Sequence, residues 1–315
     1  MRPFRYPRPR PSEITPRHLF ERRREFLRQS ASGMALAAAP ALWSTSVWSW
    51  TGRLGDAEPT EFTTDGDKTP KEAIKTYNNF FEFGTGKDDP HKNAHKLQTD
   101  PWSLKISGEV EKSGTFDLED ILKHQTFEER IYRLRCVEAW SMVIPWVGFP
   151  LGELIRRHEP TSRAKYVVFE TLHDPEQMPA QRRDILDWPY KEGLRMDEAM
   201  HPLTILAAGL YGDVLPNQNG APIRLVVPWK YGYKSIKSIV RIHLQEERPV
   251  STWEAERPNE YGFYAVVNPE VRHPRWHQAT ERRIGEDGRR RTEKFNGYGE
   301  HVAHLYEGMD LREYR

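Results

Sequence analysis

Short segments in which hydrophobic and polar residues alternate recur along the chain, and this two-residue period is typical of half-buried β-strands. In one of the clearest, Trp102, Leu104 and Ile106 alternate with polar residues up to Gly108. Other segments are rich in Val, Ile and aromatic residues, which favour strands. These segments span residues 131–137, 166–170, 203–206, 223–227 and 235–244. The pattern predicts a strand-rich domain.

Helical patterns are few and short. A helix is expected to begin at Asp117, and further helical turns are expected at 71–75 and 151–157. Regular strand–helix alternation is absent from the sequence, as is a Gly-x-Gly-x-x-Gly motif after a strand, which argues against a dinucleotide-binding fold. Long stretches without a periodic pattern are expected to be functional loops, at 172–200, 209–221 and 245–300. We therefore predict a mixed α+β domain with long loops.

The N-terminal region combines an arginine pair with a short apolar segment. Arg23 and Arg24 are followed by an Ala-rich stretch at 33–42 that is too short to span a bilayer. A basic region followed by such a segment is typical of an export signal, and the arginine pair resembles that of twin-arginine signals. The alternative is a basic helix on the surface of the folded domain. We expect export to the periplasm by the twin-arginine translocase, which carries folded proteins.

These features divide the chain into three parts. A signal peptide is expected over residues 1–50, with cleavage between about 40 and 57. Residues 51–69 are rich in Asp, Glu, Thr and Gly and are expected to form a flexible lead. Residues 70–315 would form a single catalytic domain.

Charge and composition exclude several classes of protein. Residues 1–53 contain ten arginines and three glutamates, whereas the remainder contains 37 basic and 43 acidic residues. A mildly acidic body argues against non-specific binding of nucleic acid, which requires a basic surface. Hydrophobic residues make up 37% of the chain, including ten Trp, so wholesale disorder is excluded.

Cys136 is the single cysteine of the chain, so it cannot form an internal disulfide or half of a CxxC site. A lone cysteine is usually a small buried hydrophobe. The nearby Arg133, Arg135 and Glu138 favour a thiolate instead. Such a thiolate could be a nucleophile beside a histidine, or a ligand of a metal whose other ligands come from a cofactor. The residues alone leave these interpretations open.

Several segments together resemble one known family. They span residues 78–85, 133–142, 220–232 and 234–239. From about residue 69 to residue 315, the chain resembles the molybdopterin-dependent catalytic subunits of protein-methionine-sulfoxide reductases, the MsrP family. The resemblance implies a strand-rich, barrel-like molybdopterin-binding fold of the sulfite oxidase group. It also implies a molybdenum–molybdopterin (Mo-MPT) cofactor.

The resemblance assigns roles to individual residues. Cys136 would be the thiolate ligand of molybdenum. Residues implied to bind the pterin and its phosphate are Asn78, Phe81, Glu82, Thr171, Asn219, Arg224, Ser235, Ile236 and Lys237. A phosphate suits the guanidinium of Arg224 and the ammonium of Lys237. The alternative for Arg224 is a side chain that extends from an apolar strand to water.

Two further residues are expected to act beside the metal. Glu138 lies two positions after Cys136, which on a strand would direct both side chains to the same face. Tyr261 matches a family tyrosine near the metal. Reduction of a sulfoxide consumes two protons, so acidic groups are expected at the metal. The alternatives are an ion pair of Glu138 with Arg135, and packing for Tyr261.

The resemblance implies reduction of methionine sulfoxide residues in oxidised periplasmic proteins. The electrons would come from the quinone pool through an MsrQ-like, haem-containing membrane subunit. The catalytic subunit is expected to be a monomer, because the chain is too short for the dimerisation domain usual in sulfite oxidases. The substrate would enter an open, aromatic-edged mouth formed by loop residues, including Trp229, Tyr231, Tyr261 and Tyr264.

Two alternatives remain at this stage. A sulfite dehydrogenase of the sulfite oxidase type would share the fold, but its dianionic substrate would require further cations at the metal. An exported binding module would contain Cys136 only as a buried residue.

Overall fold

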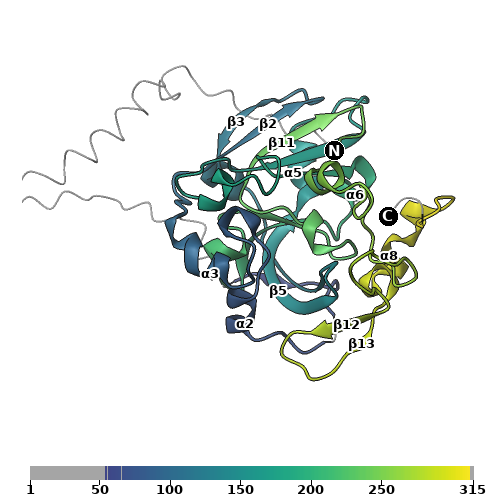
Figure 1. Ribbon diagram of the computed structural model, residues 1–315. Helices are drawn as coiled ribbons and strands as arrows, with labels where there is room; N and C mark the ends of the chain where they lie inside the picture. Colours follow the sequence, from purple (N-terminus) through teal and green to yellow (C-terminus); the bar gives the residue numbers. More distant parts are fainter. Residues whose placement is uncertain (1–53, 55, 65, 313–315) are drawn as a thin grey trace, which may run out of the picture. The chain divides into compact units, whose positions relative to one another are not determined.

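Two mixed β-sheets form the framework of the computed structural model, which describes residues 54, 56–64 and 66–312 (Figure 1). The larger sheet has eight strands, with the path β1-β4-β5-β12-β13, and β8 pairs with β5, β9 and β10. Its strands are β1 (Glu58–Pro59), β4 (Glu128–Arg135), β5 (Trp140–Pro150), β8 (Ile205–Leu210), β9 (Asp213–Val214), β10 (Arg224–Val226), β12 (Thr280–Arg283) and β13 (Arg290–Arg291).

The smaller sheet has five strands in the order β3-β2-β11-β6-β7. Its strand β11 runs parallel to β2 and antiparallel to β6. The bounds are β2 (Ser103–Gly108), β3 (Gly114–Asp117), β6 (Tyr166–Thr171), β7 (Lys191–Arg195) and β11 (Ile239–Gln245). The mixed strand directions confirm the expected α+β class.

Strand β5 is the central element of the larger sheet, and Figure 1 shows it strongly curved. Ten of its eleven residues are buried. Its pairing with β8 shifts register between Val147 and Gly148. A Cβ atom at Gly148 would lie 2.3 Å from the carbonyl oxygen of Leu206, so a glycine is required where β8 approaches most closely.

The helices of the described residues are short, and the longest, α5, has seven residues. They are α2 (Lys71–Thr76), α3 (Asp89–Asn93), α4 (Leu118–Leu122), α5 (Leu151–Arg157), α6 (Met196–Met200), α7 (Thr252–Glu256) and α8 (Gly299–Val302). Within residues 54–312, apart from the two positions not described, no helix has the length and apolar character needed to cross a bilayer.

Most elements that follow a clear sequence pattern lie where that pattern predicts them. The predicted strands overlap β2, β4, β6, β8 and β10, and the predicted helices coincide with α2, α4 and α5 to within one or two residues. The strand predicted at 235–244 begins later, because β11 starts at Ile239. The preceding residues form a loop at the candidate site.

The three segments predicted to be loops are not wholly irregular. They contain β7, α6, β9, α7, β12, β13 and α8. These elements have two to five residues each, which is too short to show a hydrophobic period. The prediction of continuous loops was therefore wrong.

The segment predicted to be a flexible lead makes contacts along β4 where it is described. Strand β1 pairs in parallel with β4, and the Thr64 amide donates a hydrogen bond of 3.0 Å to the Ile131 carbonyl. Leu54 is buried in the hydrophobic core. The predicted signal peptide over residues 1–50 lies outside the described residues.

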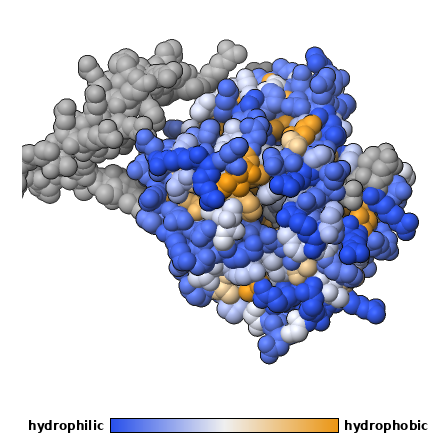
Figure 2. All heavy atoms as spheres, in the orientation of Figure 1, coloured by the Kyte–Doolittle hydropathy of each residue, from blue (hydrophilic) through white to orange (hydrophobic). Residues whose placement is uncertain are grey.

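The surface shown in Figure 2 is largely hydrophilic, with small separate apolar patches. Some charged residues of the interior form buried ion pairs. The Lys230 ammonium lies 2.6 Å from the Glu198 carboxylate, and both side chains are fully buried. Lys230 also donates a hydrogen bond of 2.5 Å to the Tyr264 carbonyl.

This buried pair generates a test of stability. Replacing Lys230 by Met would leave the Glu198 charge buried without its partner, so the free energy of unfolding should fall by about 3–5 kcal/mol. The matched control is Lys112→Met, because Lys112 pairs with Glu159 at the surface. That change should cost at most about 1 kcal/mol. Denaturant unfolding of the purified variants measures both values, and equal losses would contradict the prediction.

Candidate active site

A cavity of about 380 Å³ is lined by segments from most of the described chain. Met142, Ile144 and Trp146, alternate residues on one face of β5, form part of its wall. Eleven of the twelve predicted site residues line it: Asn78, Phe81, Glu82, Cys136, Glu138, Thr171, Asn219, Arg224, Ile236, Lys237 and Tyr261. The structure thus brings together residues that are far apart in the sequence.

Arg224 lies at one end of the cavity and is only 3% exposed. Its guanidinium donates to the carbonyls of Asn219 and Ser235 at 2.9 and 3.0 Å, and it lies over the Trp146 ring. Within the described part of the chain, Arg224 has no carboxylate partner. Burial lowers its pKa to about 9. A buried guanidinium without a counterion is unfavourable, so this end of the cavity is suited to an anion.

Lys237 lies close enough for its charge to interact with that of Arg224. Burial, and then the positive charge of Arg224, lowers the pKa of Lys237 well below its ordinary value. Glu82 is buried and acts on Lys237 with the opposite sign, and burial raises the pKa of Glu82. Glu82 therefore opposes the charge of Lys237, while the charge of Arg224 has no carboxylate beside it and leaves this part of the cavity positive.

Two asparagines lie beside these cations. Asn219 donates through its amide to the Asn78 side-chain oxygen at 3.0 Å and to the Ile74 carbonyl at 3.0 Å. Its own Oδ1 atom is buried and has no hydrogen-bond partner. Because buried acceptors are nearly always satisfied in proteins, this atom marks a place for a ligand that donates a hydrogen bond.

The loop before β11 holds the cations in place. Ser235 does not line the cavity; its hydroxyl accepts from the Val227 amide at 3.1 Å, and its carbonyl accepts from Arg224. The Thr171 hydroxyl donates to the Lys237 carbonyl at 2.8 Å. Ser235 therefore orients Arg224, while Ile236 and Lys237 face the cavity.

Cys136 lies in the wall of the same cavity, and it is buried. It follows β4 in a tight turn, in which the Ala139 amide donates to the Cys136 carbonyl at 3.0 Å and Ala139 has a φ of 64°. The expectation that Cys136 and Glu138 lie on a strand was therefore wrong. The turn nevertheless brings the Glu138 carboxylate to 3.8 Å from Sγ.

Glu138 accepts hydrogen bonds from three side chains. Asn79, Lys87 and Trp140 donate to its Oε2 atom at 3.0, 2.8 and 2.9 Å. Burial opposes ionisation of Glu138, but these donors hold its pKa below the ordinary value. The alternative pairing of Glu138 with Arg135 is wrong, because Arg135 pairs with Glu281.

Burial, and after it the neighbouring Glu138 charge, raises the pKa of the Cys136 thiol to about 12. A thiol of this kind is protonated at neutral pH and is a poor nucleophile. No histidine of the described residues lines the cavity. The structure therefore disfavours the nucleophile interpretation, while a metal would stabilise the thiolate directly.

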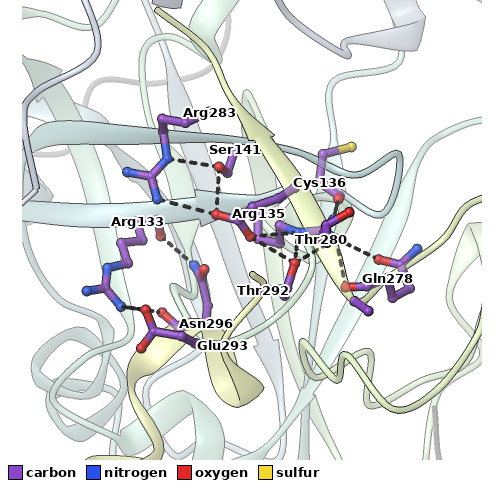
Figure 3. A network of polar contacts seen from close by, with 12 residues as sticks. Arg133, Arg135, Cys136, Ser141, Gln278, Thr280, Arg283, Thr292, Glu293 and Asn296 are labelled. Carbon is purple, nitrogen blue, oxygen red and sulfur yellow. Dashed lines mark hydrogen bonds and ion pairs between the residues drawn. The ribbon is translucent and has the colours of Figure 1, made fainter. Parts of the chain in front are cut away.

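A buried polar network fixes the backbone of Cys136 from behind (Figure 3). The Arg135 guanidinium is fully buried and donates to the Cys136 carbonyl, and its Nε atom lies 3.0 Å from Glu281. The Gln278 amide donates to the Val137 carbonyl at 2.7 Å. Figure 3 shows the sulfur pointing away from this network. The network therefore sets the position of the thiol.

The mouth of the cavity is aromatic, but only one of the expected residues forms it. Tyr261 lines the cavity, whereas Trp229, Tyr231 and Tyr264 do not. Trp229 is fully buried and donates to the Tyr306 hydroxyl at 2.7 Å. The aromatic residues near Tyr261 are instead Tyr233, Trp253 and Trp276.

Several lining residues were missed from the sequence. Asn79 could have been found, because it adjoins Asn78 in a recognisable segment. Trp253 and Arg275 gave no signal, since each lies in a segment without a periodic pattern. Lys87, which pairs with Glu138 but does not line the cavity, gave no signal either. Their role at the cavity depends on how distant segments fold together.

Comparison with known proteins agrees with this arrangement. Residues 91–253 match the sequence family described as oxidoreductase molybdopterin binding domain, which defines the class of the protein as a molybdopterin-binding oxidoreductase. Over 96% of its length, the chain is 54% identical to the protein-methionine-sulfoxide reductase catalytic subunit MsrP of Burkholderia mallei (strain ATCC 23344), covering 94% of that relative. The chain belongs to this MsrP family.

A second relative belongs to the same family, and one solved structure is similar in part. The catalytic subunit MsrP of Ralstonia nicotianae (strain ATCC BAA-1114 / GMI1000) is 54% identical, with 96% of this chain and 95% of the relative covered. Among solved structures, the sulfane dehydrogenase SoxCD from Paracoccus pantotrophus has a TM-score of 0.46 at 18% identity, covering 87% of this chain and 67% of that chain.

The residues present fit a molybdopterin. The cations at Arg224 and Lys237 suit its phosphate, and the unpaired Oδ1 atom of Asn219 suits the N–H donors of a pterin ring. Cys136 would provide a sulfur ligand in the same cavity. This fit is argued from two groups of the cavity, the Arg224 guanidinium without a carboxylate partner and the Asn219 Oδ1 atom without a hydrogen-bond donor.

Two buried arginines allow the fit to be tested without an activity measurement. Arg224→Met should reduce the molybdopterin content of the purified protein at least tenfold, because it removes a charge-assisted contact with the phosphate. In cofactor-free protein the same change should cost little stability, since it also removes an uncompensated buried charge.

The matched control is Arg135→Met. It breaks a buried pair with Glu281 and should lower the free energy of unfolding by about 3–5 kcal/mol with or without cofactor. Pterin fluorescence after extraction and denaturant unfolding measure the two effects. If Arg224→Met retained the pterin, the assigned phosphate site would be wrong.

Proposed function

We propose that this protein reduces methionine sulfoxide residues in oxidised proteins to methionine, using a molybdenum–molybdopterin cofactor. The observation that supports this most directly is the cavity, which combines one buried cysteine with a buried Arg224 guanidinium that has no carboxylate partner among the described residues. The relatives with 54% identity are named protein-methionine-sulfoxide reductase catalytic subunits. Sulfoxide reduction by a molybdoenzyme accounts for the features of the cavity and for the names of the relatives.

The cofactor, when bound, supplies the two-electron chemistry of oxygen-atom transfer. Cys136 would be the protein ligand of molybdenum. Arg135 holds its carbonyl and Gln278 holds that of Val137, so the direction of the sulfur is set before the cofactor arrives. The rigid turn would therefore keep the metal at a constant position.

The remaining predicted residues would hold the pterin. Arg224 and Lys237 would bind its phosphate, and Ser235 would orient Arg224. Asn78 and Asn219 would bind the ring system by hydrogen bonds. The other wall residues assigned to the pterin are Phe81, Glu82, Thr171 and Ile236.

At the metal, Glu138 and Tyr261 would have different roles. Glu138 already accepts hydrogen bonds from Asn79, Lys87 and Trp140, so it would hold these donors in place beside the substrate. Tyr261 would supply a hydrogen-bond donor to the substrate. The methionine side chain would lie among aromatic rings, which make favourable contacts with sulfur.

Sulfite oxidation on the same fold is the alternative reaction. Sulfite carries two negative charges and would require unpaired cations near Cys136. The arginines at the cavity mouth are already paired, Arg257 with Glu256 at 3.9 Å and Arg275 with Glu260 at 2.6 Å. A neutral sulfoxide therefore fits this mouth better than a dianion.

We further propose that the protein acts in the periplasm after export by the twin-arginine translocase. The arginine pair Arg23–Arg24 in the N-terminal sequence supports this location. We also propose that electrons come from a haem-containing membrane subunit. The relatives are named catalytic subunits, which supports the existence of a partner subunit.

The reaction is tested through Cys136. Cys136→Ser should lower turnover of an oxidised protein by at least about a thousandfold and change the Mo(V) resonance spectrum, because the hydroxyl is a harder and weaker ligand. Reduction of oxidised protein, sulfite oxidation and metal content should be measured on the same preparations. Turnover of sulfite above that of sulfoxide in the unaltered protein would favour the alternative reaction.

Export is tested separately. Replacing both Arg23 and Arg24 by Lys keeps the charge but removes the arginine pair, so folded precursor should accumulate in the cytoplasm. Cell fractionation measures the distribution, and the matched control is Arg8→Lys with Arg10→Lys. Normal periplasmic levels of the Arg23/Arg24 variant would indicate another export route.

A further inference from the structure

Tyr261 occupies a fixed position at the mouth of the cavity and is only 4% exposed. Its ring lies 4.9 Å from the Trp253 ring and is edge-on to the Tyr233 ring at 5.2 Å. These contacts from two sides restrict the ring, so the position of its hydroxyl is defined by packing.

The Tyr261 hydroxyl is contacted by Arg275. The Nη2 atom of this arginine donates a hydrogen bond of 2.9 Å to the Tyr261 oxygen. Because a guanidinium has only donors, the tyrosine must be the acceptor in this contact. The hydroxyl hydrogen of Tyr261 is therefore directed elsewhere, and no acceptor for it occurs among the described residues.

Arg275 is itself held in place. Its Nε atom donates to Glu260 at 2.6 Å, and its guanidinium lies 4.3 Å from the centre of the Trp276 ring. Glu260, Tyr261, Arg275 and Trp276 all line the cavity. The guanidinium thus contacts a carboxylate, an aromatic ring and the Tyr261 oxygen.

The environment keeps the Tyr261 hydroxyl protonated. Burial raises its pKa to about 12, against the opposing charge of Arg275, and the charges of Cys136 and Glu138 act in the same direction as burial. Cys136 and Tyr261 line the same cavity. Tyr261 is therefore a permanent hydrogen-bond donor in the wall of the cavity that contains the cysteine.

We infer that Arg275 is a positioning residue that makes the Tyr261 hydroxyl a dedicated hydrogen-bond donor to the oxygen of a bound sulfoxide. This inference rests on the proposed function. A sulfoxide oxygen is a strong acceptor, whereas the thioether product offers only a weakly accepting sulfur. The arrangement therefore recognises substrate over product. The donation from Arg275 also polarises the hydroxyl and strengthens it as a donor.

A double-mutant cycle with the holoenzyme tests the inference. Tyr261→Phe and Arg275→Ala should each lower kcat/KM for an oxidised protein about tenfold, as expected for loss of one hydrogen bond. If Arg275 acts through the hydroxyl, adding Arg275→Ala to Tyr261→Phe should lower kcat/KM by no more than about a further twofold. Arg275→Lys, which can still donate to Tyr261, should restore activity to within about threefold of the unaltered enzyme.

The matched control is Arg272→Ala, because Arg272 is an exposed arginine three positions away that does not line the cavity. It should leave kcat/KM unchanged. Molybdenum content and thermal stability of each variant should match the unaltered protein. Fully independent effects of Tyr261→Phe and Arg275→Ala would overturn the inference, since Arg275 would then contact the substrate directly or act on the fold.

Binding without turnover gives a second readout. In the absence of an electron donor, calorimetry on the oxidised holoenzyme compares a peptide containing methionine sulfoxide with the same peptide containing methionine. The unaltered enzyme should bind the sulfoxide peptide more tightly than the methionine peptide. In each single variant the ratio of the two dissociation constants should be about tenfold smaller. An unchanged preference in the two variants would overturn the inference. If the unaltered enzyme did not reduce sulfoxide at all, the proposed function would be wrong instead.

Discussion

A buried guanidinium without a counterion is the constraint on which the rest of this domain depends. Arg224 is held by backbone carbonyls and by the Trp146 ring, and none of these partners neutralises its charge. The surrounding fold therefore carries an energetic cost that only an anionic ligand removes. The loop before β11 and the turn around Asn219 are both shaped around this one group.

The part of the cavity around Cys136 has the opposite distribution of charge. There the charges are balanced, since Arg135 pairs with Glu281 and Lys87 pairs with Glu138. A balanced and fully bonded network is rigid, which is what a ligand sulfur requires. The domain thus has two distinct polar regions. The unpaired charge of Arg224 favours binding of an anion, whereas the paired charges near Cys136 fix the position of the thiol.

The sequence predicts part of this well. Strands with clear alternation, such as β2, were predicted correctly, and the motif residues Cys136 and Arg224 line one cavity. The turn after Cys136 was not predicted, because the strand-like run of residues continues into it and the left-handed Ala139 leaves no pattern. Arg275 and Trp253 lie in a stretch without periodicity, and only the tertiary structure brings them to the mouth.

The location of Arg224 also determines the direction in which a ligand enters the cavity. It is almost fully enclosed, whereas Glu138 and Lys87, close to Cys136, retain 21% and 28% side-chain exposure. An elongated ligand with a phosphate at one end can reach Arg224 only if that end enters first. Its reactive end then follows and stops beside Cys136, on the more open side. The enclosed position of Arg224 therefore has two consequences. The phosphate end of the ligand enters first, and a substrate reaches the cavity only from the side of Cys136.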